Sequence, residues 1–138
     1  QIDFVGAFPQ APVEREIYMK IPSGFEVDGT KDEYVLRLNR NLYGQKQAGR
    51  VWNEYLHQKL TKELGFVRLS YDECVYFRKN VMYVLYTDDS ILAGPDEKEL
   101  DKAIADIKNA KLDITVEGNL QDFLGINIER QSDGSMHL

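Results

Sequence analysis

Hydrophobic residues recur along the chain in two patterns, one typical of strands and one typical of helices. Between residues 82 and 94, two apolar runs flank the adjacent pair Asp88 and Asp89. Apolar runs rich in strand-forming residues on both sides of a polar pair predict a strand, a tight turn and a second strand, with the aspartates at the tip. Because Asp is a common turn former, these two residues alone would more often be ordinary turn residues than a site.

Two segments repeat apolar residues at helical spacing. The first covers 48–64 and is followed by Gly65, a residue favoured just past the end of a helix. The second, expected at 97–109, is preceded by a capping-box pattern formed by Asp96 and Glu99. Each helix is expected to place one apolar stripe against a sheet.

Shorter apolar runs predict further strands, and Asp3 lies in the first of them. The runs are Gln1–Phe8, Glu16–Met19, Tyr34–Leu38, Phe66–Leu69, Val75–Arg78, Leu112–Val116 and Phe123–Ile128. Pro9, Pro12 and Pro22 are expected to interrupt any helix, and Asp133-Gly134 predicts a hairpin turn. This order of elements predicts an α+β fold, an open sandwich with helices on one face of an antiparallel sheet.

Composition limits the size and the partners of this fold. At 138 residues and 43% apolar content, the chain suits one packed domain. Its net charge of -6 gives no overall attraction to nucleic acid, so such binding would need a local patch or metal ions. The lone Cys74 excludes an internal disulfide and is expected to be buried. No run approaches the roughly 20 apolar residues that span a bilayer, and no secretory signal is visible.

A local patch of positive charge precedes and enters the first long helix. Residues 34–53 contain no acidic residue and four basic ones, Arg37, Arg40, Lys46 and Arg50. This segregation of charge can form an anion-binding surface or an ordinary exposed basic face, and the sequence supports the two equally.

The three aspartates would form one site if the first strand lay beside the 82–94 hairpin. Asp3 would then be close to Asp88 and Asp89, and three carboxylates at one end of a sheet repel each other unless divalent cations bind them. Two hard cations about 3.5 to 4 Å apart can activate a hydroxyl and stabilise a leaving phosphate. The arrangement suits phosphoryl or nucleotidyl transfer.

Five ordered blocks of the sequence resemble the reverse transcriptase of copia-type LTR retrotransposons. They are Asp3 with Ala7-Phe8, Glu16–Met19 with Pro22–Phe25, Leu42–Ala48 with Trp52, Tyr86–Asp89, and Phe123–Ile126. The resemblance implies a single incomplete reverse transcriptase domain over 1–138. It would comprise a polymerase palm with a ferredoxin-like antiparallel sheet and two helices on one face, plus a partial fingers insertion at about 9–45.

The resemblance also assigns roles to individual residues. It implies metal ligands and catalytic carboxylates at Asp3, Asp88 and Asp89, with the Phe4 carbonyl as a further ligand. Phe8 would select deoxynucleotides by blocking the sugar 2′ position. The remaining implied contacts are to nucleotide and template by Tyr43, Gly44, Lys46 and Gln47, and to the primer by Tyr86, Phe123, Leu124 and Gly125.

The implied cofactor is a pair of Mg²⁺ ions, with Mn²⁺ as an alternative. The implied partners are an RNA or DNA template with a DNA primer, dNTPs, and the missing fingers, thumb and RNase H parts of a polyprotein, without a membrane. The expected location is a cytoplasmic virus-like particle whose product acts in the nucleus. Without those parts, the resemblance leaves the activity of the fragment alone open.

Three positions depart from the family's pattern, and two other functions stay open. Thr87 stands in place of a usual Val, Gly49 in place of a frequent Pro, and Ser90 in place of an apolar residue. One alternative is a degenerate, non-catalytic transposon remnant. The other is a different two-metal enzyme on the same fold, such as a nucleotide cyclase, since fold alone does not determine function.

Overall fold

The computed structural model describes residues 1–137, which form two compact units. Unit 1 contains Gln1–Val5 and the described residues from Leu56 onward, and unit 2 contains Gly6–Tyr55. The boundary therefore falls once after the first strand and once inside the first long helix.

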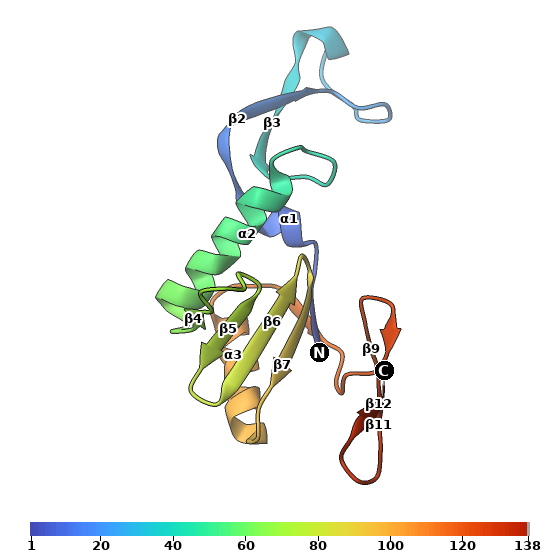
Figure 1. Ribbon diagram of the computed structural model, residues 1–138. Helices are drawn as coiled ribbons and strands as arrows, with labels where there is room; N and C mark the ends of the chain where they lie inside the picture. The colour runs from blue at the N-terminus through green and yellow to red at the C-terminus, as the bar shows by residue number, and fades with distance from the viewer. Residues whose placement is uncertain (138) are drawn as a thin grey trace. The chain divides into compact units, whose positions relative to one another are not determined.

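Unit 1 is built on a six-stranded antiparallel sheet in the order β4-β5-β6-β7-β1-β8 (Figure 1). The strands are β1 (Ile2–Phe4), β4 (Val67–Arg68), β5 (Val75–Arg78), β6 (Val81–Tyr86), β7 (Asp89–Ala93) and β8 (Ile114–Val116). The first strand of the chain thus lies between β7 and β8, which are distant from it in the sequence.

Helical elements cover one face of this sheet. In unit 1 these are the last residues of α2 (Ala48–Gln58), from Leu56 onward, the π-helical segment η2 (Lys59–Glu63) that continues it, and α3 (Glu97–Asn109), which crosses behind the strands in Figure 1. Arg78 of β5 links the end of η2 to α3, since its Nη1 donates to the Leu64 carbonyl at 3.0 Å and to Asp106 Oδ2 at 2.9 Å. The end of η2 and α3 therefore lie on the same side of the sheet.

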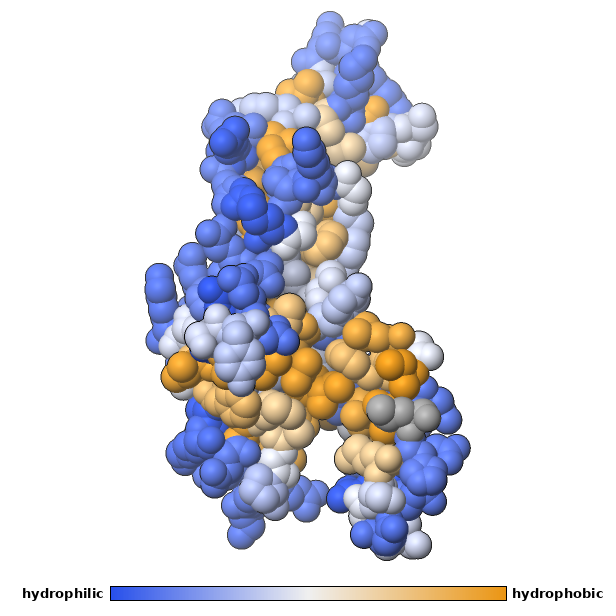
Figure 2. All heavy atoms as spheres, viewed as in Figure 1, coloured by the Kyte–Doolittle hydropathy of each residue, from blue (hydrophilic) through white to orange (hydrophobic). Residues whose placement is uncertain are grey.

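The core of unit 1 lies between this face and the helices. Alternate β6 residues Val81, Tyr83 and Leu85 are almost completely buried, and Ala103 and Ile107 of α3 are fully buried. The opposite face of the sheet is also rich in apolar residues, several of which are visible in Figure 2. The predicted α+β class, with helices on one face of an antiparallel sheet, agrees with the structure.

Unit 2 contains a second, two-stranded sheet. Its elements are α1 (Ala7–Gln10), β2 (Pro12–Lys20), the 3₁₀ turn η1 (Lys31–Glu33) and β3 (Val35–Arg40), with β2 and β3 antiparallel. Asn41 follows β3 and is fully buried, and its Nδ2 donates to the Ala11 and Pro12 carbonyls. This side chain fastens the end of β3 to the start of β2.

Two short hairpins end the described chain. The first joins β9 (Asp122–Phe123) to β10 (Ile126–Asn127), and the second joins β11 (Glu129–Arg130) to β12 (Met136–His137). The hairpin predicted at Asp133-Gly134 is the second of these and is confirmed. The single strand predicted over Phe123–Ile128 is wrong, because Leu124 and Gly125 adopt positive φ angles of 55° and 78° and form a turn.

The N-terminal strand prediction was too long. The strand ends at Phe4, and after Gly6, at a φ of 61°, residues Ala7–Gln10 form a helical turn that includes Pro9. Pro9 is tolerated there because the first turn of a helix has no intrahelical partner for its backbone N–H. The expectation that this proline would interrupt any helix is therefore wrong.

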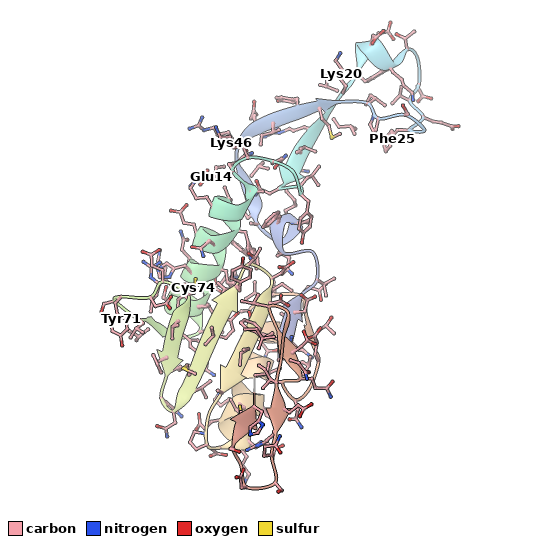
Figure 3. The ribbon with its side chains drawn as sticks, turned by 45° about the vertical axis from the view of Figure 1, so that its right-hand side comes forward. Glu14, Lys20, Phe25, Lys46, Tyr71 and Cys74 are labelled. Atoms are coloured by element: carbon pink, nitrogen blue, oxygen red, sulfur yellow. The ribbon has the colours of Figure 1, made fainter. Side chains whose placement is uncertain are left out.

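Two local predictions also need correction. Cys74 is exposed rather than buried, in the loop before β5 where Figure 3 labels it beside Tyr71. Asp96 does cap α3, since its side chain accepts from the Lys98 N–H at 2.9 Å. Glu99, however, pairs with Lys79 instead of completing a capping box.

Candidate functional site

The paired aspartates lie where the β6–β7 hairpin turns. Tyr86 at the end of β6 pairs with Asp89 at the start of β7, and Thr87 and Asp88 form the two-residue turn between them. Thr87 has a φ of 54°, and two-residue hairpin turns require positive φ at their first central position. Asp88 is therefore held in the turn itself, and Asp89 in the adjoining strand.

The register of β1 places Asp3 directly opposite Asp89. The neighbouring backbone bond, from the Phe4 N–H to the Asp88 carbonyl at 3.1 Å, makes Asp3 and Asp89 a non-hydrogen-bonded pair. In such pairs the side chains share a face and the Cβ atoms are about 4.5 to 5.5 Å apart. The structure thus brings the first aspartate to the two aspartates of the distant hairpin.

The surroundings of Asp3 disfavour its charged form. Partial burial raises the pKa of the Asp3 carboxyl, and the negative charges of Asp88, Glu117 and Asp89 raise it further, in that order. A backbone hydrogen bond from Phe4 opposes this only in part. The end of the sheet therefore carries more negative charge than its surroundings compensate.

Glu117 was not predicted as a member of this cluster. It directly follows β8, and its N–H donates to the Gln1 carbonyl at 3.0 Å, beside the start of β1. The sequence predicted the strand at Leu112–Val116, but only the strand order places the end of that strand next to Asp3.

The donor chemistry of this cluster fits a divalent cation, although the side chains do not form a finished cage. Within residues 1–137, no group of three or more His, Cys, Asp or Glu side chains is close enough to hold a metal ion. Carboxylate oxygens are the ligands that Mg²⁺ prefers, and a bound cation would offset the burial and the neighbouring negative charges that raise the pKa of Asp3.

The residues predicted to contact the nucleotide lie in unit 2. The Phe8 and Tyr43 rings are in contact, with centroids 4.6 Å apart, and Gly44 has a φ of 88° in the turn that follows. Lys46, labelled in Figure 3, is exposed, and Gln47 is partly buried. The structure thus joins Phe8 to the 42–48 loop by a ring contact that the sequence did not predict.

Part of the predicted basic patch is neutralised. Arg37 pairs with Glu16 at 3.1 Å, and Arg50 pairs with Glu14 and with Glu54. Arg50 also lowers the pKa of Glu14 through a direct hydrogen bond. At these two arginines the structure favours an exposed face with ion pairs over an open anion site.

The residues predicted to bind the primer are spread over two sheets. Tyr86 is exposed and pairs with Asp89. Phe123, Leu124 and Gly125 lie in the β9–β10 hairpin, which is a separate two-stranded sheet without backbone pairing to the strands that carry the aspartates. The structure therefore connects only Tyr86 directly with the acidic cluster.

No helix in the described part of the chain has the length and the hydrophobicity needed to cross a membrane.

Comparison with known proteins places the chain in a family. The model of the reverse transcriptase (RNA-dependent DNA polymerase) family matches residues 1–138, and the chain belongs to this family. No solved structure matches it.

Its curated relatives are transposon proteins. The chain is 36% identical over 137 residues to the retrovirus-related Pol polyprotein from transposon TNT 1-94 of Nicotiana tabacum, with 95% of the chain and 10% of the relative covered. It is 34% identical over 142 residues to the corresponding polyprotein from transposon RE2 of Arabidopsis thaliana, with 100% and 10% covered.

A shorter relative is the putative transposon Ty5-1 protein of Saccharomyces cerevisiae. It is 32% identical over 143 residues, with 99% of the chain and 45% of the relative covered. The chain therefore spans about a tenth to under a half of the length of these relatives. These matches confirm the resemblance to copia-type transposon reverse transcriptases.

Proposed function

We propose that this chain is the catalytic part of an RNA-directed DNA polymerase of a copia-type retrotransposon polyprotein. The reaction would transfer a nucleotide from a dNTP to a primer 3′-hydroxyl by a two-metal mechanism. The observation that carries the proposal is the β1–β7 register, which sets Asp3 opposite Asp89 next to the turn that holds Asp88. Membership in the reverse transcriptase family favours this activity over that of a nucleotide cyclase.

The acidic cluster would hold the metal ions. Asp3 and Asp88 would be the main ligands, with the Phe4 carbonyl as a further one, and Asp89 would contribute charge and position. Two bound Mg²⁺ ions, or Mn²⁺ in their place, would supply the Lewis acidity that lowers the pKa of the primer hydroxyl. The aspartates themselves provide fixed negative charge at the end of a rigid sheet, on residues aligned by backbone pairing.

Residues of unit 2 would bind the incoming nucleotide. Phe8 would exclude the ribose 2′-hydroxyl, and its contact with Tyr43 supports this role because it restrains the ring. Tyr43, Gly44, Lys46 and Gln47 would contact nucleotide and template. Tyr86 and the Phe123-Leu124-Gly125 turn would contact the primer.

We also assign the fold to parts of a polymerase. The sheet of unit 1 and its helices would be a ferredoxin-like palm, and residues 9–45 would be a partial fingers insertion within one incomplete domain of 1–138. The two-stranded β2–β3 sheet supports this assignment, since it pairs with no strand of the larger sheet. The rest of the fingers, the thumb and RNase H would come from the parent polyprotein. The complete protein would act on template, primer and dNTPs in a cytoplasmic virus-like particle. Its DNA product would act in the nucleus.

Primer extension by the complete parent polyprotein tests the proposal. With Mg²⁺, an RNA template and a DNA primer, the parent should extend the primer, and Asp88→Asn should abolish extension without unfolding the protein. A matched control is Asp101→Asn, which removes an exposed carboxylate on α3 and should leave extension unchanged. Extension by the Asp88→Asn variant at the rate of the unsubstituted parent would refute the metal assignment.

A further inference from the structure

A buried side-chain hydrogen bond joins β6 and β7, the two strands of the hairpin that carries the paired aspartates. The Tyr83 hydroxyl and Ser90 Oγ are 2.8 Å apart, and both residues are fully buried. Ser90 directly follows Asp89 in β7, while Tyr83 lies in β6. Ser90 is thus the polar partner of a core tyrosine.

Hydrophobic patterning leaves the register of this hairpin poorly specified. On the face toward the helices lie Val81, Leu85 and Leu92, and on the opposite face Met82, Val84 and Ile91. A one-residue slip exchanges the two faces, so apolar residues of the two faces would change places, while Asp89 would move onto the buried face. The burial of apolar side chains therefore does not by itself select the observed register.

The Tyr83–Ser90 bond does distinguish one register from the next. Ser90 pairs with Leu85, so Tyr83 is its diagonal neighbour on the same face, within reach of a long aromatic side chain. The Tyr83 ring is packed against Phe66 and Tyr76, with centroids 5.8 and 6.1 Å away. After a slip, Ser90 would leave the core and the Tyr83 hydroxyl would stay buried without a partner, which is strongly unfavourable.

We propose that Tyr83 and Ser90 are positioning residues, whose hydrogen bond helps to set the register of the β6–β7 hairpin and keeps Asp89 on the face on which it lies opposite Asp3 across the β1–β7 pair. The inference rests on the proposed function in one respect, that the aligned aspartates bind divalent cations. Neither residue is proposed to touch the substrate or the metal. A buried polar pair in an otherwise apolar contact selects one alignment among several, as a buried Asn does in coiled coils.

The register itself can be measured by NMR on the 138-residue chain. Asp3 and Asp89 form a non-hydrogen-bonded pair, so their Hα atoms should give a strong cross-strand NOE in the unsubstituted protein. In Ser90→Ala and in the nearly isosteric Tyr83→Phe, this NOE should weaken and a second set of signals should appear for 81–93. Val81→Ala is the matched control, because it removes buried apolar volume from the same strand and face without affecting the hydroxyls.

The consequence for the site can be measured with Mn²⁺ as the probe, by its effect on water proton relaxation. Ser90→Ala and Tyr83→Phe should each weaken Mn²⁺ binding about tenfold, the range found when groups that orient metal ligands are removed. Val81→Ala should change the affinity less than about twofold despite its loss of stability. Full affinity and a single set of hairpin signals in both hydroxyl variants would overturn the inference, as would equal weakening by Val81→Ala.

The two proposals fail in different ways. If Asp88→Asn binds Mn²⁺ as tightly as the unsubstituted chain, the metal site of the proposed function is wrong. The NOE comparison does not depend on metal, so it still decides whether Tyr83 and Ser90 set the register.

Discussion

Asp3 lies in an acidic cluster with Asp88, Asp89 and Glu117, and its negative charge is unfavourable in the folded protein when no metal is bound. Its pKa is raised by partial burial and by Asp88, Glu117 and Asp89. A carboxyl group whose pKa is higher in the folded than in the unfolded state lowers the stability of the protein once the pH rises above the pKa that the group has in the unfolded chain.

We therefore expect Asp3→Asn to stabilise the chain at neutral pH in EDTA. The gain should be roughly 0.5 kcal/mol, the size of one like-charge contact across a strand pair. The gain should vanish as the pH falls below about 3.9, the ordinary pKa of Asp, because protonated Asp3 no longer repels its neighbours. Urea unfolding at both pH values measures it. A gain that persists in acid would show that charge is not the cause.

Thr87 is strained at the tip of the hairpin. Its φ of 54° is unusual for a residue branched at Cβ, and such strain costs of order 1 to 3 kcal/mol. Glycine removes that cost but adds backbone entropy to the unfolded chain. Thr87→Gly should therefore stabilise the protein by about 1 kcal/mol in urea unfolding. Gly65→Ala, at a φ of 70°, is the reciprocal control and should destabilise it.

Phe8 is predicted to set sugar selectivity. If its ring excludes the 2′-hydroxyl, Phe8→Ala in the complete parent should raise incorporation of ribonucleotides relative to deoxynucleotides by about 10- to 100-fold, a steric discrimination of the size known for apolar pockets. Single-nucleotide extension with each substrate measures the ratio. Tyr43→Phe keeps the ring that contacts Phe8 and should leave the ratio near its original value. An unchanged ratio in Phe8→Ala would reject the selector role.

At the scale of elements, Arg78 forms polar links from the sheet to the end of η2 and to α3. It is mostly buried, binds the Leu64 carbonyl and Asp106, and places its guanidinium 4.8 Å from the centre of the Phe66 ring. Burial alone would raise the pKa of Asp106, but hydrogen bonds from Lys102 and Arg78 lower it overall. This contribution to stability is therefore present above the unfolded pKa of Asp and is lost as the pH falls through the lowered folded value.

Arg78→Met should cost about 2 kcal/mol of unfolding free energy at neutral pH, because it leaves Asp106 partly buried with only Lys102 as a partner. Arg78→Lys keeps the charge but cannot reproduce the planar fork, so its loss should be intermediate. Urea unfolding of the three proteins measures both values. Equal stability of Arg78→Met and the unsubstituted chain would show that apolar contacts alone hold the helices on the sheet.

Elements with strong local signals could be predicted from the sequence. The helix α3 begins and ends at the predicted residues Glu97 and Asn109, because its cap and its apolar period agree. The strand predicted over Phe123–Ile128 failed because its apolar residues continue through Leu124-Gly125, where the backbone turns. Apolar content alone does not distinguish one strand from a tight hairpin.

At the scale of the whole molecule, the site depends on pairing between distant parts of the chain. The sequence suggested that β1 could lie beside the 82–94 hairpin, and the structure supplies the exact register. Glu117 and the Tyr83–Ser90 bond could not be predicted, since both depend on strand order and on which face each residue occupies. Family membership over residues 1–138 agrees with the ordered blocks, whereas the relatives extend well beyond this chain.

Locating a paramagnetic cation on the 138-residue chain tests directly whether Asp3, Asp88 and Asp89 form a cation site. In an NMR titration with Mn²⁺, we expect selective broadening of the amide signals of Asp3, Asp88 and Asp89, competed by excess Mg²⁺ and abolished in Asp88→Asn. The exposed carboxylate of Asp101 on α3 provides a reference within the same spectrum. Uniform broadening along the chain, or equal broadening of the three site amides in Asp88→Asn, would contradict a cation site formed by these aspartates.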